Sequence, residues 1–416
     1  MTAPVRLTRR LLLGAAVTGA AGLAVACGRP GEPGPGASSG PGTPGASSAP
    51  ASTTPPTTTT PSTPSSSAPE TSRAPDCVTG LDLEQQIGQL MMVGVDSTGA
   101  SADQLELIGR IGAGAVVMMG NNDQGVDAIR TVTDELRDAL DPDAPALLVA
   151  TDQEGGVVRR LSGPGFDEMP SAATQASWSR STLRKRATTW AKQLRRAGVD
   201  SPLAPVADVV PPEIGNRNEP IAANDRGYGD DPDEVAERID AVVTGLRSGG
   251  MATALKHFPG LGRVIGNTDF ASDVVDDRTG PDDPLWGSFL AGMEVGSDMV
   301  MMATARYTKL DPSAPAAFSS EIISDLLRGD LGWDRVVISD DLGVAKQVAD
   351  LEPGERAVRF LKAGGDIVIN VDPSSVGAMV KAVLAAARKS DRFAEQIAVK
   401  AERVLRMKAD RGLVSC

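Results

Sequence analysis

The feature that most constrains the fold of this chain is a regular alternation of short apolar runs with longer amphipathic segments from Val78 onward. Continuous apolar strands separated by helices indicate a parallel sheet covered by helices. Eight such units between residues 76 and 416 favour a closed (β/α)₈ barrel, the TIM-type α/β barrel, over an open sheet. No second domain of comparable size is left over. The expected strands lie within residues 87–95, 113–120, 144–156, 201–210, 251–260, 297–307, 333–343 and 364–372, and the clearest helices within 102–112, 125–140, 179–197 and 233–248.

Residues 1–27 carry the pattern of an export signal. Met1–Arg10 is short and basic, and the apolar run Leu11–Ala26 is too short to cross a bilayer comfortably. The run ends in AVAC, which predicts a bacterial lipoprotein signal with Cys27 as the lipidated N-terminus, and the preceding LTRR resembles a twin-arginine export signal. The alternative is an uncleaved membrane anchor. Both interpretations place the folded region outside the cytoplasm, anchored to the cell membrane by lipid or secreted after signal cleavage.

Residues 28–75 consist almost entirely of Gly, Pro, Ser, Thr and Ala. Such a composition cannot bury enough apolar surface to offset the entropy of ordering, so we expect a disordered tether. Its proline content favours an extended chain. The predicted organisation is therefore a signal over 1–27, a tether over 28–75 and the barrel over 76–416.

The three cysteines divide simply. Cys27 takes the lipid, which leaves Cys77 at the start of the folded region and Cys416 at its last position. In an exported protein an even pair suggests a disulfide, here one that joins the two ends of the barrel domain. The alternative is two free thiols.

The charge of the chain excludes some classes of partner. The net charge is −13 and the isoelectric point is about 4.7, which argue against binding to nucleic acid or to an anionic membrane surface. We therefore expect membrane contact through the lipid anchor only. We also expect a monomer.

In barrels of this kind the chemistry lies at the C-terminal ends of the strands. The polar residues there are rich in carboxylates, and they contain no Cys or His cluster with metal-ligand spacing. A Mg²⁺ site built from several Asp is the alternative, but none of them sits in a metal-binding motif, so we expect neither metal nor cofactor. Paired carboxylates across a barrel mouth are suited to glycoside hydrolysis. The strand-end residues are Asp152, Gln153, Glu154, Asp208, Lys256, His257, Arg306, Asp340, Asp341, Asn370 and Asp372.

Five motifs carry a resemblance to a known family. They are VATDQEGGVVRRL, LAPVADV, DRGYGDDP, KHFPGLG and GWDRVVISDDLG, in this order from about Leu81 to Met407. Together they resemble glycoside hydrolase family 3, specifically its single-barrel bacterial β-N-acetylglucosaminidase branch in its actinobacterial lipoprotein form. The resemblance implies a retaining enzyme that removes terminal β-linked N-acetylglucosamine from a carbohydrate substrate, here fragments of cell-wall glycan derived from peptidoglycan.

The resemblance also implies roles for individual residues. Asp340, in VISDDLG, matches the nucleophile that forms a glycosyl-enzyme intermediate, whereas Asp341 fits better as a residue that caps the following segment. The positions that match substrate contacts are Asp152, Arg160, Arg226, Lys256 and His257. The alternative for these five is a set of salt bridges at the barrel rim.

The chain departs from the family pattern after KHFPG. The loop normally continues with a second histidine and ends in Asp-Ser-His, whose histidine and Asp form the general acid/base dyad. Here the second histidine is Leu261, the dyad Asp is Asn267 and the catalytic histidine is Asp269. His257 is the only histidine of the chain, so no other histidine can take over the role. Two further departures are Arg306, for a histidine after the sixth strand, and Val157, for an arginine.

Three interpretations of these departures remain open. In the first, Asp269 is itself the acid/base, because a carboxylic acid is the usual proton donor in glycoside hydrolysis when its pKa is raised, and Asn267 supports the loop. In the second, the protein is a tethered sugar-binding module that has lost catalysis and uses Asp340, Asp152 and Arg160 for binding only. In the third, the enzyme is active on a different sugar, and Arg306 reflects the changed substrate.

Overall fold

The computed structural model describes residues 77–416. The predicted export signal, the lipidation site Cys27 and the predicted tether all lie outside the described residues. Within residues 77–416, no helix is long and apolar enough to cross a membrane.

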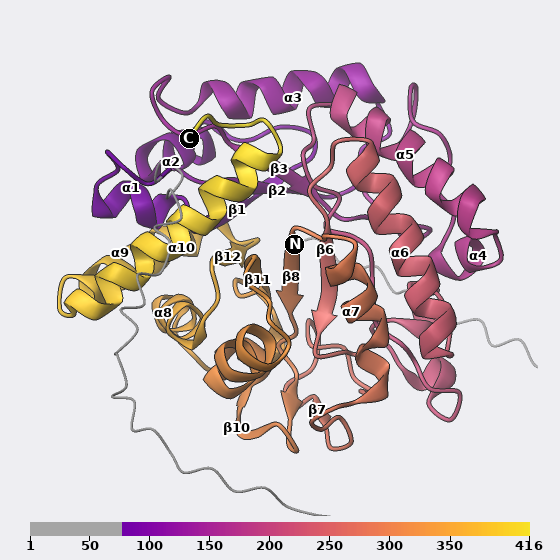
Figure 1. Ribbon diagram of the computed structural model, residues 1–416. Helices are drawn as coiled ribbons and strands as arrows, with labels where there is room; N and C mark the ends of the chain where they lie inside the picture. The colour runs from indigo at the N-terminus through magenta and orange to yellow at the C-terminus, as the bar shows by residue number, and fades with distance from the viewer. Residues whose placement is uncertain (1–76) are drawn as a thin grey trace, which may run out of the picture. The chain divides into compact units, whose positions relative to one another are not determined.

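The centre of the fold is a parallel sheet of seven strands in the order β3–β2–β1–β12–β11–β8–β6 (Figure 1). Residues 201–206 fill the gap between the first and last strands of this order, because Ser201 forms a parallel bridge with Ala150 of β3 and Val206 forms one with Lys256 of β6. The ring is thereby closed, and the predicted (β/α)₈ barrel is confirmed. The strands are β1 (Met91–Asp96), β2 (Ala115–Met119), β3 (Leu148–Thr151), β6 (Ala254–Phe258), β8 (Met299–Met302), β11 (Val336–Asp341) and β12 (Ile367–Asn370).

The fourth expected strand does not form a regular strand, which corrects the sequence-based prediction. Its prolines, Pro202 and Pro205, have no N–H to donate to a sheet, and Leu203 takes a left-handed backbone angle, with φ of 44°. The segment instead accepts hydrogen bonds on both sides. The carbonyl of Pro202 accepts from Gln153, and that of Pro205 accepts from Lys256. Closure therefore depends on the carbonyl groups of this segment more than on its N–H groups.

Helices cover the outside of the barrel (Figure 1). Ile87 and Gly88 were predicted to begin the first strand. They instead end helix α1, and the strand starts at Met91. Ser179 and Asp231 cap α5 and α6 by accepting hydrogen bonds from backbone N–H groups of the first turn. The helices are α1 (Leu83–Gly88), α2 (Ala102–Ile111), α3 (Val126–Asp138), α4 (Ala172–Ala176), α5 (Arg180–Arg196), α6 (Pro232–Ser248), α7 (Gly287–Glu294), α8 (Pro353–Ala363), α9 (Pro373–Ala387) and α10 (Asp391–Asp410), and a π-helix spans Glu321–Asp330 between β8 and β11.

The loops that follow the barrel strands contain additional short strands. β4 (Gln153–Gly155) and β5 (Val158–Arg159) form an antiparallel hairpin directly after β3, and β7 (Val275–Asp276), β9 (Arg306–Tyr307) and β10 (Asp311–Pro315) form a small sheet. The hairpin requires glycine at Gly155, whose φ is 111° and whose added Cβ would lie 2.1 Å from the carbonyl oxygen of Pro170. The EGG sequence is thus explained by the turn that it makes.

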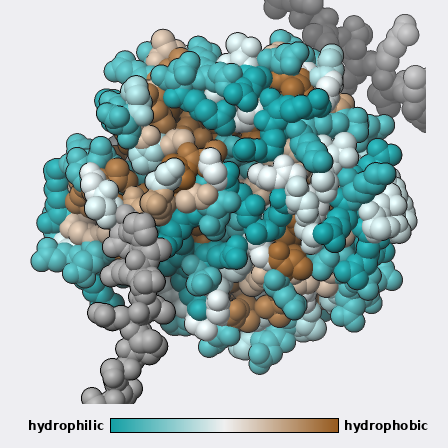
Figure 2. Space-filling model, turned by 45° about the horizontal axis from the view of Figure 1, so that its top comes forward, coloured by the Kyte–Doolittle hydropathy of each residue, from teal (hydrophilic) through white to brown (hydrophobic). Residues whose placement is uncertain are grey.

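The apolar side chains of the barrel strands and of the inner helix faces form one core. β3, β8 and β12 are buried along their whole length, as expected for strands enclosed on both faces. On the face shown in Figure 2, hydrophilic residues cover most of the surface, and hydrophobic residues appear as small separate patches.

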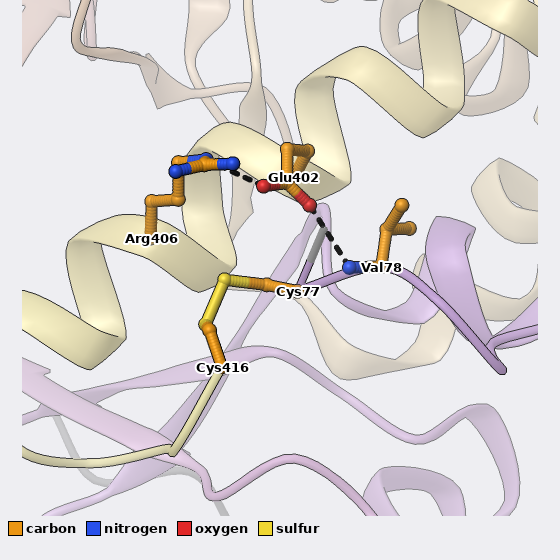
Figure 3. Close-up of a disulfide and its surroundings, with 5 residues drawn as sticks. All are labelled: Cys77, Val78, Glu402, Arg406 and Cys416. Atoms are coloured by element: carbon orange, nitrogen blue, oxygen red, sulfur yellow. Dashed lines mark hydrogen bonds and ion pairs between the residues drawn. A yellow bond between two sulfur atoms is a disulfide. The ribbon is translucent and has the colours of Figure 1, made fainter. Parts of the chain in front are cut away.

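Cys77 and Cys416 are joined by a disulfide, with their Cα atoms 4.6 Å apart (Figure 3). The bond links positions 339 residues apart in the sequence. Next to it, the N–H of Val78 donates to the Glu402 carboxylate of α10 at 2.9 Å, and Arg406 forms an ion pair with the same carboxylate. The start and the end of the described chain are therefore held together by both covalent and polar contacts.

Candidate active site

A cavity of about 520 Å³ lies at the C-terminal ends of the barrel strands. Its wall combines the ends of β3, β6 and β11 with the loops that follow them. The structure brings to this one cavity all eight residues for which the sequence predicted a catalytic, substrate-binding or loop-supporting role: Asp152, Arg160, Arg226, Lys256, His257, Asn267, Asp269 and Asp340.

One wall of the cavity is a network of paired charges. The Lys256 ammonium lies 2.7 Å from a carboxylate oxygen of Asp152 and 2.7 Å from one of Glu154. Arg226 donates two hydrogen bonds to Glu154, at 2.7 and 2.8 Å. Burial alone would favour the neutral acid, but the charges of Arg226 and Lys256 hold the pKa of Glu154 well below its usual range. The Glu154 carboxylate is therefore held in its charged form between two cations.

Sequence reasoning noted Glu154 only as a strand-end residue and gave it no role. The signal that could have found it is its spacing, two residues after Asp152 in the same motif. Asp152 keeps partial exposure to the cavity, whereas Glu154 is buried behind it. Asp152 thus faces the space in which a ligand can bind, and Glu154 anchors the two cations.

His257 is held by Asp208, another strand-end residue to which the sequence assigned no role. The imidazole Nδ1 lies 2.8 Å from the Asp208 carboxylate, which also accepts hydrogen bonds from the backbone N–H groups of His257 and Leu261. Because a carboxylate only accepts, the proton of a neutral His257 sits on Nδ1 and leaves Nε2 as a hydrogen-bond acceptor. Leu261, which replaces the second histidine of the family pattern, is buried.

The two adjacent carboxylates at the end of β11 have different surroundings. Asp341 accepts hydrogen bonds from the backbone N–H groups of Gly343, Val344, Ala345 and Val371, at 2.7–3.1 Å. It therefore holds the loop after β11 in place. Asp340 has no such set of contacts: within residues 77–416 its side chain accepts one hydrogen bond, from the N–H of Asp341 at 2.9 Å. Of the two, Asp340 is the carboxylate free to react.

The loop that carries Asp269 is attached to the barrel on both sides. On one side, the Asn218 amide donates to the carbonyls of Leu261 and Val264, at 2.7 and 2.8 Å. On the other side, the backbone carbonyls of Thr268 and Asp269 accept from the N–H groups of residues 347 and 346. The Asn267 side chain accepts a hydrogen bond from the N–H of Asp269 at 2.9 Å, so it contacts the loop as an acceptor. Sequence reasoning gave Asn218 no role, because the two loop carbonyls that accept from its amide lie 43 and 46 residues away. Its amide oxygen accepts locally, from the N–H groups of Ile221 and Ala222.

The environment of Asp269 favours its protonated form. The residue is exposed at the cavity mouth, but protein atoms around its carboxyl group hinder hydration of the charged form. This burial, followed by the negative charge of Asp340, raises the pKa of Asp269 to about 6, against a lowering effect of His257. A carboxyl group with such a pKa can both give and take a proton near neutral pH.

The remaining predicted positions differ in their relation to the cavity. Arg160 lines it and donates to the Asn121 amide oxygen at 3.2 Å, while its buried Nε has no hydrogen-bond partner in the described structure. Val157 lines the mouth and is exposed. Arg306 is not part of the lining and pairs with Asp273 at 3.1 Å. The interpretation in which Arg306 reflects a changed substrate is therefore not supported by direct contact.

Residues 77–416 contain no group of three or more His, Cys, Asp or Glu side chains placed to hold a metal ion. The strand-end residues outside the cavity have structural contacts instead. Asp372 caps α9 by accepting from the N–H of Ser374, and the Asn370 amide donates to Ser375.

Comparison with known proteins identifies the fold and its family. The N-terminal domain of glycosyl hydrolase family 3 matches residues 82–407. A β-hexosaminidase of Xanthomonas campestris is 35% identical over 308 residues, which cover 71% of this chain and 88% of that protein. A solved β-N-acetylhexosaminidase from Beutenbergia cavernae is 45% identical with a TM-score of 0.77, covering 80% of this chain and 99% of that one.

A further solved structure, LpqI of M. tuberculosis, is 27% identical with a TM-score of 0.67, covering 79% of this chain and 94% of that one. The family domain spans nearly the whole barrel, and the relatives align over most of their own length. The chain belongs to glycosyl hydrolase family 3.

Proposed function

We propose that this protein is a retaining β-N-acetylhexosaminidase in which Asp340 is the nucleophile and Asp269 replaces the family's histidine as acid/base. The observation that carries the proposal is the pairing of two unlike carboxyl groups in one cavity. Burial and the charge of Asp340 raise the pKa of Asp269 to about 6, whereas Asp340 lines the same cavity and accepts a hydrogen bond from the N–H of Asp341. The names of the Xanthomonas and Beutenbergia relatives support the choice of sugar.

In the first step, neutral Asp269 protonates the glycosidic oxygen while the Asp340 carboxylate attacks the anomeric carbon. The glycosidic bond breaks, the leaving group departs as an alcohol, and Asp340 becomes a neutral ester. The ester no longer carries the charge that raised the pKa of Asp269. Asp269 therefore becomes a more stable carboxylate at the moment when it must act as a base. In the second step it takes a proton from water, which attacks the anomeric carbon and frees Asp340.

The paired-charge wall supplies the binding contacts in this proposal. Asp152 accepts hydrogen bonds from sugar hydroxyls, and Lys256 lies beside it as a donor. Arg160 lines the same cavity, and the Nε2 of His257 is free of Asp208. These groups match the hydroxyl-rich surface of a sugar without depending on aromatic stacking, which suits a chain with 3% aromatic residues.

We further propose that the substrates are cell-wall glycan fragments outside the cytoplasm. The support for this step comes from the sequence alone, namely the lipoprotein pattern that ends at Cys27 and the Gly/Pro/Ser/Thr-rich stretch that follows it. A lipid anchor and a long tether would keep the barrel near the wall.

The test compares the two carboxyl groups with a matched control. Wild-type protein should hydrolyse an aryl β-N-acetylglucosaminide, and a fluorinated N-acetylglucosaminide should add its sugar mass to the peptide that contains Asp340. Asp340→Ala should abolish both signals. Asp269→Asn should reduce turnover by at least 100-fold, since general acid catalysis typically contributes about 10²–10⁴. Asp273→Asn, an exposed carboxyl change in the same loop but outside the cavity lining, should keep activity within about twofold.

Two outcomes would contradict the proposal. Wild-type protein that binds N-acetylglucosamine but neither turns over the glycoside nor traps the label would be the sugar-binding module. Asp269→Asn that stays within a few-fold of wild type would remove Asp269 from the acid/base role while leaving the enzyme assignment intact.

A further inference from the structure

Three exposed apolar side chains line the site cavity. Phe270, Val157 and Val344 are 82%, 65% and 62% exposed, and all three line the cavity. They are three of the seven large apolar side chains that are exposed in residues 77–416. They come from three separate loops, those that follow β3, β6 and β11. We call these three residues the apolar collar.

The backbone under the collar is held in place. The N–H of Val344 donates to the Asp341 carboxylate at 2.7 Å, and the N–H of Phe270 donates to the carbonyl of Asn267 at 3.1 Å. The hairpin that presents Val157 is fixed by the hydrogen bond from Gly156 to the carbonyl of Met169. The fold therefore holds these side chains in water at defined positions. Exposed apolar side chains that line one cavity together with the charged groups of the proposed site indicate a surface that a ligand covers.

The position of the collar indicates which part of the substrate reaches it. Phe270 directly follows Asp269, the proposed acid, which must contact the oxygen between the sugar and its leaving group. The groups that would hold the sugar lie deeper, because Lys256 and His257 are buried in the barrel. What lies beyond Asp269, toward solvent, is therefore the leaving group.

We propose that the apolar collar is the leaving-group subsite and that it selects leaving groups with a flat apolar ring face, with Phe270 as the main specificity-determining contact. This inference rests on the proposed function. An aromatic ring or the C–H face of a second pyranose can stack on Phe270 while the two valines contact its edges. A small or strongly polar leaving group gains nothing from these contacts.

The experiment uses two substrates with the same sugar, 4-methylumbelliferyl β-N-acetylglucosaminide and N-acetyl-β-glucosaminyl fluoride, whose fluoride cannot reach the collar. Phe270→Ala should lower kcat/KM for the aryl substrate about tenfold, mainly through KM, because loss of one apolar contact changes specificity by about tenfold or more. The same variant should stay within about twofold of wild type on the fluoride. Phe270→Tyr, which keeps the ring, should restore the aryl activity. Val399→Ala, an exposed apolar change on α10 outside the cavity lining, should change neither.

Equal losses on both substrates would overturn the inference, because they would mean that Phe270 only positions the loop. Unchanged aryl kinetics would overturn it as well. If wild-type protein has no turnover, the proposed function fails and calorimetric affinities for phenyl and methyl thioglycosides of N-acetylglucosamine test the collar. A preference for the phenyl compound that Phe270→Ala removes supports the collar; equal affinities, or no binding of either compound, overturn it.

Discussion

Two lysines are buried at opposite ends of the barrel, and their partners give them opposite chemical states. Lys256, 2% exposed at the C-terminal ends of the strands, contacts the carboxylates of Asp152 and Glu154. Lys408, 1% exposed at the other end, donates only to the neutral oxygens of Gln89 and Ala146, at 2.8 and 2.9 Å.

Burial lowers the pKa of both lysines, but only for Lys256 do neighbouring carboxylates outweigh this effect. The carboxylates of Asp152 and Glu154 raise the pKa of Lys256 above its ordinary value in spite of its burial. The burial of Lys408 is opposed only by the charge of Asp200, and its pKa falls to about 7. The comparison shows that partners, and not depth, decide whether a buried amine keeps its charge. The charged amine lies at the wall of the proposed sugar site, and the amine with the lowered pKa lies where it makes only internal contacts.

The largest effect is expected when the ion pairs of Lys256 are removed. Lys256→Met leaves Glu154 and Asp152 without their ammonium partner. Removing one member of a buried ion pair lowers the free energy of unfolding by about 3–5 kcal/mol, and the proposed sugar contacts of Asp152 are lost with it. Urea unfolding measures the first effect and kcat/KM the second. The exposed Lys381→Met on α9 is the control, with an expected change within about 0.5 kcal/mol. A Lys256→Met protein as stable as wild type would show that the pair does not stabilise the fold.

The next effect concerns the pH dependence of stability at the other end. Between pH 7 and pH 10 an unfolded lysine is protonated while folded Lys408 is neutral, so stability from this group rises with pH and is lost as pH falls through about 7. The difference in free energy of unfolding between Lys408→Met and wild type should therefore change by about 3 kcal/mol from pH 6 to pH 9. The variant should be favoured at pH 6, and wild type should gain at pH 9 from its two hydrogen bonds. A constant difference across this range would mean that Lys408 stays charged.

The smallest expected effect tests whether a neighbouring charge also sets the pKa of a carboxyl group. The charge of Asp340 contributes to the raised pKa of Asp269, so Asp340→Asn should lower the pKa of Asp269 from about 6 toward its ordinary value, by about one unit. Carbon-13 NMR titration of the aspartate carboxyl groups measures this shift without any need for turnover. In wild type the same group should produce a fall of kcat/KM as pH rises through about 6, because the first step needs the protonated acid. An unchanged pKa of Asp269 in Asp340→Asn would show that the charge of Asp340 does not affect Asp269.

The parts of this molecule that the sequence predicted depend on local patterns. The apolar pattern predicted the strands of a barrel, and the convergence of strand ends predicted that Asp152, Lys256 and Asp340 lie around one cavity. Asp269 was predicted from the family resemblance of the loop after KHFPG, and it lines the same cavity. The irregular fourth strand has the apolar pattern of a regular one, and only Pro202 and Pro205, which lack N–H groups, distinguish it.

The partners of the site residues could not be predicted in this way. Glu154 and Arg226 are 72 residues apart, and Asp208 and His257 are 49 apart. Such pairs form where separate loops meet above the barrel. Their spacing in the sequence does not indicate that they are in contact. The pKa of Asp269 is hidden for the same reason, because it depends on Asp340 from a different strand.

The disulfide between Cys77 and Cys416 has a mechanical consequence. Any pull applied through the residues that precede Cys77 enters the folded region at a position covalently bonded to its last residue. The force therefore acts on the segment that leads to α1 and on the segment that follows α10 at the same time. Helices α1 and α10 pack against each other in the fold. Without the bond, α1 could be peeled away alone. With it, residues 77–416 form a closed covalent loop, and a pull that enters at Cys77 acts on α1 and α10 together.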